Sequence, residues 1–176
     1  VMAIIGVLAT AVIVAINPNK RLAQARDAQR KTDIAAISNA LIGYYTLIGK
    51  YPIETNCDTS YGAKTTSDCS DPSLFSPTGD WAAGRINLNL ITEQAFLKKL
   101  PKDPTNNTTY YYVYEPQKTT TNNFCNNLAT DPCDYYWIGT LLESPTDPAN
   151  PIFRCSDYPG LPDGQGRQAP VRAHRR

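Results

Sequence analysis

Five cysteines are the residues of this chain whose chemistry can be tested most directly against their spacing. They lie between Cys57 and Cys155, no two of them form a C-x-x-C pair, and the only histidine is His174, near the end of the sequence. Zinc and haem sites need such pairs or nearby histidines, so the spacing disfavours both. Disulfides are the remaining role for these cysteines, and disulfides form in an oxidising compartment outside the cytosol. The cysteines therefore predict an exported protein.

Few acidic residues are spaced in a way that suggests a metal site or acid–base chemistry. Asp157 and Asp163, within SDYPGLPDGQG, could ligate Ca²⁺ through carboxylate oxygens, but their spacing is irregular and a plain turn is the favoured alternative. No nucleophile is paired with a base, because His174 lies among arginines in a Gly- and Pro-rich stretch. The sequence predicts no enzyme and no cofactor, with calcium as the one metal alternative.

Aromatic and basic residues raise the question of nucleic acid. The tyrosine-rich stretches 110–114 and 135–137 could stack on bases, and the arginines of 167–176 could contact phosphates. Strand side chains that alternate into a core explain the tyrosines more simply, and a solvated terminus explains the arginines. The formal net charge is only +1, so the field of the whole molecule is weak. DNA or another surface ligand stays a secondary hypothesis.

The first of the elements that would position these residues is an apolar segment. Residues 1–16, VMAIIGVLATAVIVAI, carry no charge and one polar side chain, Thr10. A bilayer span takes about 20 apolar residues, so the stretch is slightly short for one. A cleaved signal peptide and a single-span anchor are alternatives, and the helix-forming sequence that resumes after Pro18 disfavours the first. The residues expected to be buried in lipid or in an assembly are Ile4, Ile5, Gly6, Val7, Leu8, Val12, Ile13 and Ile16.

Two residues are expected to weaken the N-terminal helix. Pro18 has no backbone N–H and disfavours helical geometry at Asn17, so the helix is expected to kink or loosen there. Gly6 is a second weak point. Residues 19–49 again favour helix, because good helix formers dominate and no proline occurs before Pro52.

One face of this second helical stretch is apolar. Five residues recur at steps of three and four, which places them on one stripe that is expected to pack on a globular head. They are Ile34, Ile37, Leu41, Tyr44 and Ile48. The turns before the stripe are basic instead: five cations between Lys20 and Lys31 against Asp27 and Asp33 leave a local charge of +3. We expect that segment to be solvated with Asp–Arg pairing, to face a neighbouring copy, or to bind lipid headgroups.

The remainder of the chain reads as a head built on a small sheet. Residues 53–85 form a long irregular loop, and an apolar short helix or turn follows within 86–100, where Pro101 ends it. Strands are expected at 109–115, 135–142 and 152–155. The predicted class is α+β, a long N-terminal helix packed on a small antiparallel sheet.

The segment Ala3–Pro52 as a whole resembles the N-terminal helix of bacterial type IV pilins and of the major pseudopilins of type II secretion. Those proteins run from an apolar half-helix through an Arg/Asp/Gln-rich stretch to an aromatic amphipathic stretch ending in Tyr-Pro, here Tyr51-Pro52. The stretches 100–104, LPKDP, and 136–143, YWIGTLLE, are also similar to the family's head. The family's mature chain begins with a methylated aromatic residue and carries a glutamate a few residues further in. Both would precede Val1, so we expect upstream sequence.

The sequence as a whole divides into five regions, of which the resemblance leaves residues 53–85 and the tail unexplained. These are an apolar half-helix (1–18), an amphipathic half-helix (19–52), a loop region with a short helix (53–100), an antiparallel head (101–160) and a basic tail (161–176). The disulfide pairing stays open. The local spacing favours Cys57–Cys69 and Cys125–Cys133, with Cys155 free or intermolecular, whereas the resemblance offers Cys125 or Cys133 paired with Cys155.

The resemblance also implies a function. The chain would be a pilus subunit that is anchored in the inner membrane before assembly and then polymerises, with the aid of assembly machinery, into an extracellular filament of identical copies. Exposed heads would serve adhesion, twitching motility or DNA uptake. The alternatives are a pseudopilin that drives secretion, and a monomeric membrane-anchored binding protein.

Overall fold

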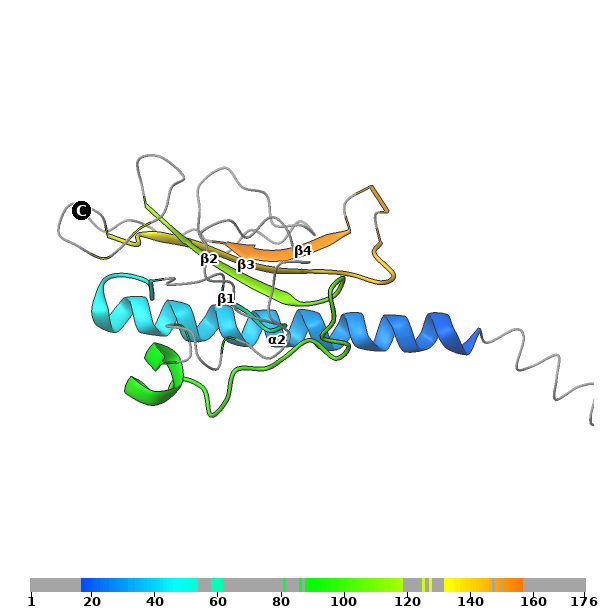
Figure 1. The fold of residues 1–176 in the computed structure, drawn as a ribbon, viewed down its shortest axis with the longest axis horizontal. Helices are drawn as coiled ribbons and strands as arrows, with labels where there is room; N and C mark the ends of the chain where they lie inside the picture. The colour runs from blue at the N-terminus through cyan, green and yellow to red at the C-terminus, as the bar shows by residue number, and fades with distance from the viewer. Residues whose placement is uncertain are drawn as a thin grey trace, which may run out of the picture.

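The computed structural model describes residues 17–53, 58–61, 81, 86, 88–118, 125, 127, 132–146, 148–149 and 151–156. Within these residues the chain is α+β: one long helix, α2, lies along one face of an antiparallel sheet (Figure 1). Several predicted features lie outside the described residues. They are the apolar set between Ile4 and Ile16 with Gly6, the cysteines Cys57 and Cys69, the calcium candidates Asp157 and Asp163, and the basic tail.

Helix α2 spans Pro18–Ile48, close to the predicted range. Asn17 caps its start: the backbone of Asn17 is left-handed (φ 44°), and its side-chain Oδ1 accepts the N–H of Lys20 at 3.3 Å. Pro18 occupies the first turn, where no N–H is needed. Helical geometry is therefore absent at the residue before Pro18, as the proline predicts. Gly49 ends the helix in a left-handed conformation (φ 82°), and its N–H donates to the Tyr45 carbonyl at 2.7 Å.

The apolar stripe of α2 faces the sheet. Ile34, Ile37, Leu41 and Tyr44 are buried in the core. Ile48 is different, because 39% of it is exposed. Ile48 is the last helical residue, and the chain turns away at Gly49, so the predicted stripe continues one turn beyond the surface that covers it.

Four strands form the sheet in the order β1-β2-β3-β4, all antiparallel. Strands β2 (Tyr112–Gln117), β3 (Tyr135–Leu141) and β4 (Ile152–Ser156) are the long ones, and β1 (Asp58–Thr59) is a two-residue edge strand that the sequence did not predict. Strand β2 begins three residues later than expected. The cause is a turn at Asn107, whose Oδ1 accepts the N–H groups of Thr109 and Tyr110, both at 2.9 Å.

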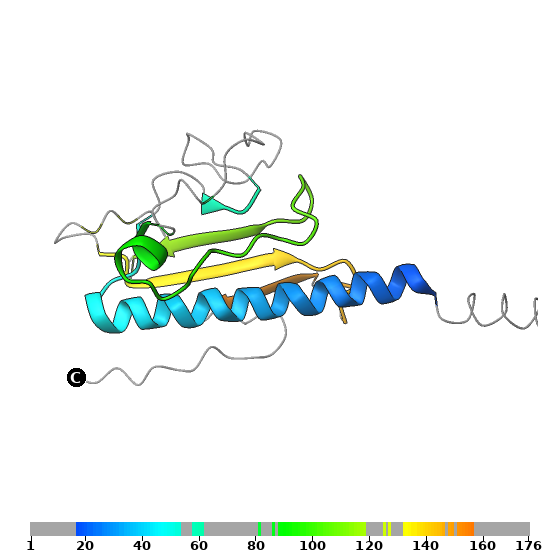
Figure 2. The same cartoon turned by 90° about the horizontal axis from the view of Figure 1, so that it is seen from below.

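The core lies between α2 and the sheet. Tyr112 and Tyr114 of β2 and Tyr136 and Ile138 of β3 alternate inward and are buried, as period-two strands require. A short π-helix, η3 (Leu88–Glu93), lies beside the C-terminal end of α2 and closes the core from the other side (Figure 2). Trp81, Ile86, Leu90 and Leu100 also belong to the core.

Helix α2 extends beyond the sheet at its N-terminal end, as both views show (Figures 1 and 2). Its first five residues are exposed, including Leu22, which ends that run. Among the helices of the described residues, none combines the length and the apolarity that crossing a bilayer requires.

Candidate functional site

An ionic cluster with a buried centre joins α2 to the head at the point where the helix leaves the sheet. Arg26, Asp27 and Arg30 come from α2, Asp103 from the connection between η3 and β2, and Glu143 from the residues that follow β3. These five residues are called the ionic cluster below. The sequence brings two of them together by helix periodicity alone, because Asp27 and Arg30 are three residues apart. The other partners come from distant parts of the chain.

Arg30 is the centre of the ionic cluster and is completely buried. Its Nε donates to Asp103 Oδ2 at 2.7 Å and its Nη2 to Asp103 Oδ1 at 2.9 Å, a two-point contact that matches the planar guanidinium. Its Nη1 reaches Asp27 Oδ1 at 2.8 Å and Glu143 Oε1 at 2.7 Å. Burial alone would lower the pKa of Arg30, but the hydrogen bonds to these three carboxylates outweigh it and raise the pKa.

Asp27 connects the helix to the backbone of the head. Its two carboxylate oxygens accept the N–H of Glu143 at 2.9 Å and the N–H of Ser144 at 2.7 Å. These two donors belong to the turn after β3, which thereby gains hydrogen-bond partners outside the sheet. The end of the central strand is therefore tied directly to α2.

The pKa values of the other two carboxylates are lowered. The hydrogen bond from Arg26 holds the pKa of Glu143 at about 2; burial opposes this shift and Arg30 adds to it. For Asp103, burial would raise the pKa, but hydrogen bonds from Arg30 and from the backbone N–H groups of Thr105 and Asn106 lower it. Both carboxylates are therefore ionised at neutral pH.

The carboxylates of the ionic cluster are all hydrogen-bonded within the protein. Each oxygen of its three carboxylates accepts at least one hydrogen bond. Across the described residues, no set of three or more His, Cys, Asp or Glu side chains is arranged to hold a metal ion. The arrangement fixes a helix to a sheet.

Aromatic residues make the second contact between helix and head. The hydroxyls of three strand tyrosines reach the helix or the turn after it: Tyr112 donates to Asp33 Oδ2 at 2.9 Å, Tyr136 lies 2.7 Å from Ser38 Oγ, and Tyr114 donates to the Pro52 carbonyl at 2.8 Å. Burial and the bond to Asp33 raise the pKa of Tyr112. The tyrosines are thus core residues with satisfied hydroxyls.

The far end of α2 is fixed by a disulfide-closed loop. A disulfide joins Cys125 to Cys133, which is the pairing that the local spacing favours. This bond excludes a disulfide from either residue to Cys155. Asn127, inside the loop, donates from Nδ2 to the Tyr51 carbonyl at 2.9 Å and accepts the Cys133 N–H at 2.9 Å. Tyr51 N–H in turn donates to the Cys133 carbonyl at 2.8 Å. The loop is therefore hydrogen-bonded to the chain just past α2. Cys155 lies half-buried on β4.

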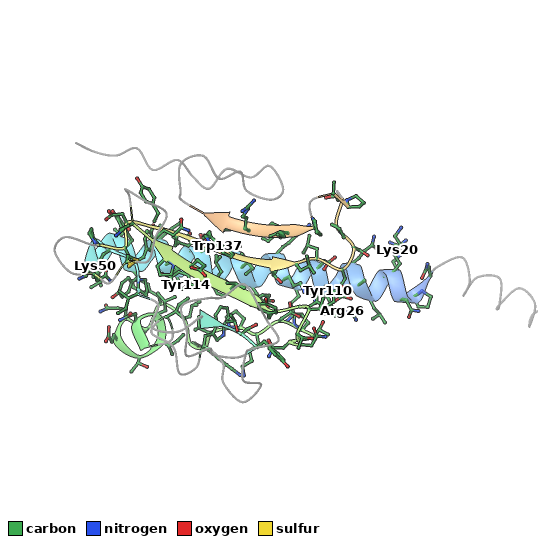
Figure 3. All side chains as sticks on the ribbon, turned by 45° about the horizontal axis from the view of Figure 1, so that its top comes forward. Lys20, Arg26, Lys50, Tyr110, Tyr114 and Trp137 are labelled. Atoms are coloured by element: carbon green, nitrogen blue, oxygen red, sulfur yellow. A yellow bond between two sulfur atoms is a disulfide. The ribbon has the colours of Figure 1, made fainter. Side chains whose placement is uncertain are left out.

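The basic segment of α2 is not uniformly solvated, which corrects part of the expectation from its charge. Arg30 and Asp27 are buried inside the head, whereas Lys20 and Arg21 are exposed on the projecting turns. Figure 3 shows this division: Arg26 and Tyr110 lie near the point where the helix leaves the sheet, and Lys20 lies beyond it. The Tyr110 ring covers the guanidinium of Arg30, whose Cζ is 4.7 Å from the ring centroid.

Sequence reasoning missed the ionic cluster because its partners are remote. Arg30 and Asp103 are separated by 73 positions, and Arg26 and Glu143 by 117. The only local signal was the Asp27–Arg30 spacing, which is equally typical of a solvated helix face. The stretches 100–104 and 136–143, singled out as resembling the pilin head, contain Asp103 and Glu143.

Comparison with known proteins leaves the chain unassigned: no family model, no curated protein and no solved structure matches it.

Proposed function

We propose that this chain is the structural subunit of a helical filament of the type IV pilin or pseudopilin kind, built from many copies that pack through their N-terminal helices. One observation carries the proposal: α2 projects beyond the sheet at the end that follows the uncharged residues 1–16. In a filament, the projecting helix and the apolar residues before it would form the interior, and the heads would form the outer surface.

Moving the apolar segment from a membrane into such an assembly changes its hydrophobic free energy little. Residues 1–16 carry no charge, so water is a poor environment for them. Before assembly a membrane can cover them, and in a filament the same residues of sister copies can do so. The exchange replaces one apolar environment by another and costs little hydrophobic free energy.

The ionic cluster supports the same proposal. A helical polymer needs every copy to present its helix at the same angle, because identical contacts repeat along the fibre. Arg30 and Asp27 fix α2 to the connection before β2 and to the turn after β3. Residues before Arg26 then leave each head in one direction.

The test introduces a charge into the apolar segment of the full-length chain. Ile4→Asp or Val12→Asp should abolish fibres seen by electron microscopy of sheared cell surfaces, because a carboxylate cannot be buried unpaired among apolar helices. Ile4→Leu is the matched control and should assemble normally.

The same cells distinguish the competing functions. Long surface fibres that contain the chain support a pilus, and short fibres needed for secretion support a pseudopilus. A wild-type chain that stays monomeric in detergent and never forms fibres would contradict the proposal and favour a membrane-anchored binding protein. Fibre yield unchanged by Ile4→Asp would contradict helix-mediated packing.

A further inference from the structure

We propose that Tyr112 and Asp33 form a redox site, at which Tyr112 gives up an electron to a one-electron oxidant while its phenolic proton passes to Asp33. The oxidant is a small radical in solution, of the class of the carbonate radical. The inference goes beyond the proposed function, because it concerns the interior of a single head and requires no filament.

Tyr112 and Asp33 are placed for proton transfer. The Tyr112 hydroxyl donates to Asp33 Oδ2 at 2.9 Å, a distance that allows a proton to move between the two oxygens, and Tyr112 is completely buried. A phenol that loses an electron becomes a strong acid, so a base that accepts its proton makes the oxidation easier. The hydroxyls of Tyr136 and Tyr114 meet a serine hydroxyl and a backbone carbonyl instead, which are weaker bases than a carboxylate. These three bonds single out Tyr112 as the tyrosine that can be oxidised with immediate loss of its proton.

The step leaves no new ion in the interior. One electron passes from Tyr112 to the oxidant, the Tyr112 O–H bond breaks, and an O–H bond forms at Asp33 Oδ2. The products are a neutral phenoxyl radical and a neutral carboxylic acid, while the oxidant is reduced by one electron. Because a charge in the interior of a protein is costly, neutralising the carboxylate of Asp33 offsets part of the cost of the oxidation.

The charges beside the pair favour loss of an electron. The ionic cluster holds two arginines and three carboxylates, which leaves it with a charge of −1, and Asp33 adds a second negative charge. An electron leaves a negatively charged region more easily than a neutral one. Burial and the bond to Asp33 raise the pKa of Tyr112, so its proton stays in place until the electron is lost. Burial also raises the pKa of Asp33, which makes its carboxylate a better proton acceptor.

A row of aromatic rings leads from the outer part of the head to Tyr112. The ring centroids of Tyr45 and Tyr51 are 4.6 Å apart, and those of Tyr51 and Tyr136 are 4.7 Å apart. The Tyr114 ring follows at 6.4 Å from Tyr136, and Tyr112 lies two residues earlier on the same face of β2, about 7 Å along the strand. Tyr45 is only half-buried, so an oxidant can reach the row there and electrons can move outward from ring to ring.

Trp81 flanks Tyr112 outside this row. The two ring centroids are 5.9 Å apart, and Trp81 is almost completely buried. Its Nε1 is buried and has no hydrogen-bond partner within the described part of the chain. An oxidised indole at this place has no base to take its proton, so an electron from Tyr112 refills it. Both routes therefore end at Tyr112, the ring that is bonded to a carboxylate.

Photo-oxidation of the full-length chain in detergent tests the site. A flash of light on ruthenium tris(bipyridine) with persulfate generates a one-electron oxidant, and samples frozen after the flash are examined by electron paramagnetic resonance. We expect a tyrosyl radical that persists after radicals on exposed tyrosines have coupled pairwise, because the buried Tyr112 cannot meet a ring of a second molecule. Tyr112→Phe should lower this persistent signal at least fivefold. Tyr135→Phe, on the neighbouring strand β3, is the control and should change it less than twofold.

Asp33→Asn separates proton transfer from structure. The asparagine carbonyl still accepts the hydrogen bond of Tyr112, but an amide is too weak a base to take the proton. The persistent radical should therefore fall at least tenfold while the circular dichroism spectrum stays that of wild type. In wild type the rate of radical formation should not depend on the concentration of buffer base, since the base is Asp33 itself. In Asp33→Asn the residual formation should rise with that concentration.

The outcomes separate this inference from the proposed function. A wild-type chain without a persistent tyrosyl radical, a radical of wild-type amplitude in Tyr112→Phe, or equal yields from Asp33→Asn and wild type would each overturn the redox site and leave the filament standing. A wild-type chain that forms no fibres would overturn the proposed function, whereas the radical measurements would still decide the redox site.

Discussion

Arg30 and Asp103 meet in a two-point contact, 2.7 and 2.9 Å long, across 73 positions of sequence and without exposure to water. A buried ion pair adds little net stability over a well-packed apolar pair, because both ions lose their hydration. Losing one partner is costly, since it leaves the other charge buried alone. This asymmetry makes the ionic cluster the most informative place to mutate.

Arg30→Met should destabilise the head strongly. The substitution leaves Asp27, Asp103 and Glu143 facing one another with only Arg26 as a counter-charge, and loss of one partner of a buried pair costs about 3–5 kcal/mol. Urea unfolding followed by tryptophan fluorescence measures the change. Lys20→Met, on the exposed turns of α2, is the control and should shift the free energy of unfolding by less than about 0.5 kcal/mol. Equal midpoints for the two variants would show that the ionic cluster does not hold the head together.

Stability should fall on acidification, and Glu143 should account for part of the slope. Its pKa is lowered from 4.5 to about 2 in the folded chain, chiefly by Arg26. The unfolded chain therefore takes up the proton first, so the contribution of Glu143 is complete above about pH 4.5 and is lost as the pH falls toward 2. Asp103, whose pKa is also lowered, acts in the same direction.

Glu143→Gln isolates this contribution. The variant should be less stable than wild type at pH 6, and the difference should shrink as the pH approaches 2, with urea midpoints measured at each pH. Burial raises the pKa of Asp33, which contributes with the opposite sign in both proteins and cancels in the comparison. A difference independent of pH would contradict the assignment.

Removing the disulfide should loosen the far end of α2. Replacing Cys125 and Cys133 together by serine frees a short loop, with a sequence separation of 8, and chain entropy predicts a loss of about 2.5 kcal/mol. The N–H of Tyr51, which donates to the Cys133 carbonyl, should exchange with deuterium faster. The N–H groups of β2 and β3 should keep their relative protection. Unaltered exchange at Tyr51 would show that the loop does not brace the helix end.

Two glycines provide a contrast within one experiment. A Cβ at Gly139 would lie 2.9 Å from the Phe153 carbonyl oxygen, which is backbone of the paired strand β4, so Gly139→Ala should cost about 1–3 kcal/mol. At Gly43 the obstacle is the half-exposed Phe96 ring, which can swing aside, while alanine gains up to about 1 kcal/mol of helix propensity. Gly43→Ala should therefore be nearly neutral. Thermal unfolding of both variants measures the difference, and comparable losses would refute it.

Local patterns predicted α2 and the three longer strands but not the short edge strand β1, and long-range geometry decided the rest. The spacing of Ile34, Ile37 and Leu41 correctly predicted which face of α2 packs on the head, because the helical period can be recognised from neighbouring residues alone. The start of β2 was wrong by three residues, since the Asn107 side chain competes for the N–H groups that a strand would have used. Ile48 follows the helical period but lies beyond the end of the surface that covers the others.

The ionic cluster could not have been predicted in the same way. The nearby Asp27 distinguishes Arg30 from Arg21 in the sequence, but such a pair is equally typical of a solvated helix face, so it does not predict that Arg30 is buried while Arg21 is exposed. The difference arises only when the turn after β3 and the connection before β2 are brought to the same side of α2. A sequence shows which residues are charged, but only the folded chain shows which of those charges are buried.

The two attachments of α2 also determine how the head bears a mechanical load. A pull on the helix from Asn17 enters the head at Arg26, Asp27 and Arg30, whose bonds to Glu143, Ser144 and Asp103 act side by side. Bonds loaded in parallel share the force, so several must break together before the helix can slide along the sheet. At the opposite end of α2, beyond Gly49, the disulfide-closed loop holds Tyr51 by hydrogen bonds. Tension along the axis is thus borne first by the ion pairs of the ionic cluster and then by the hydrogen bonds that join Tyr51 to the disulfide-closed loop.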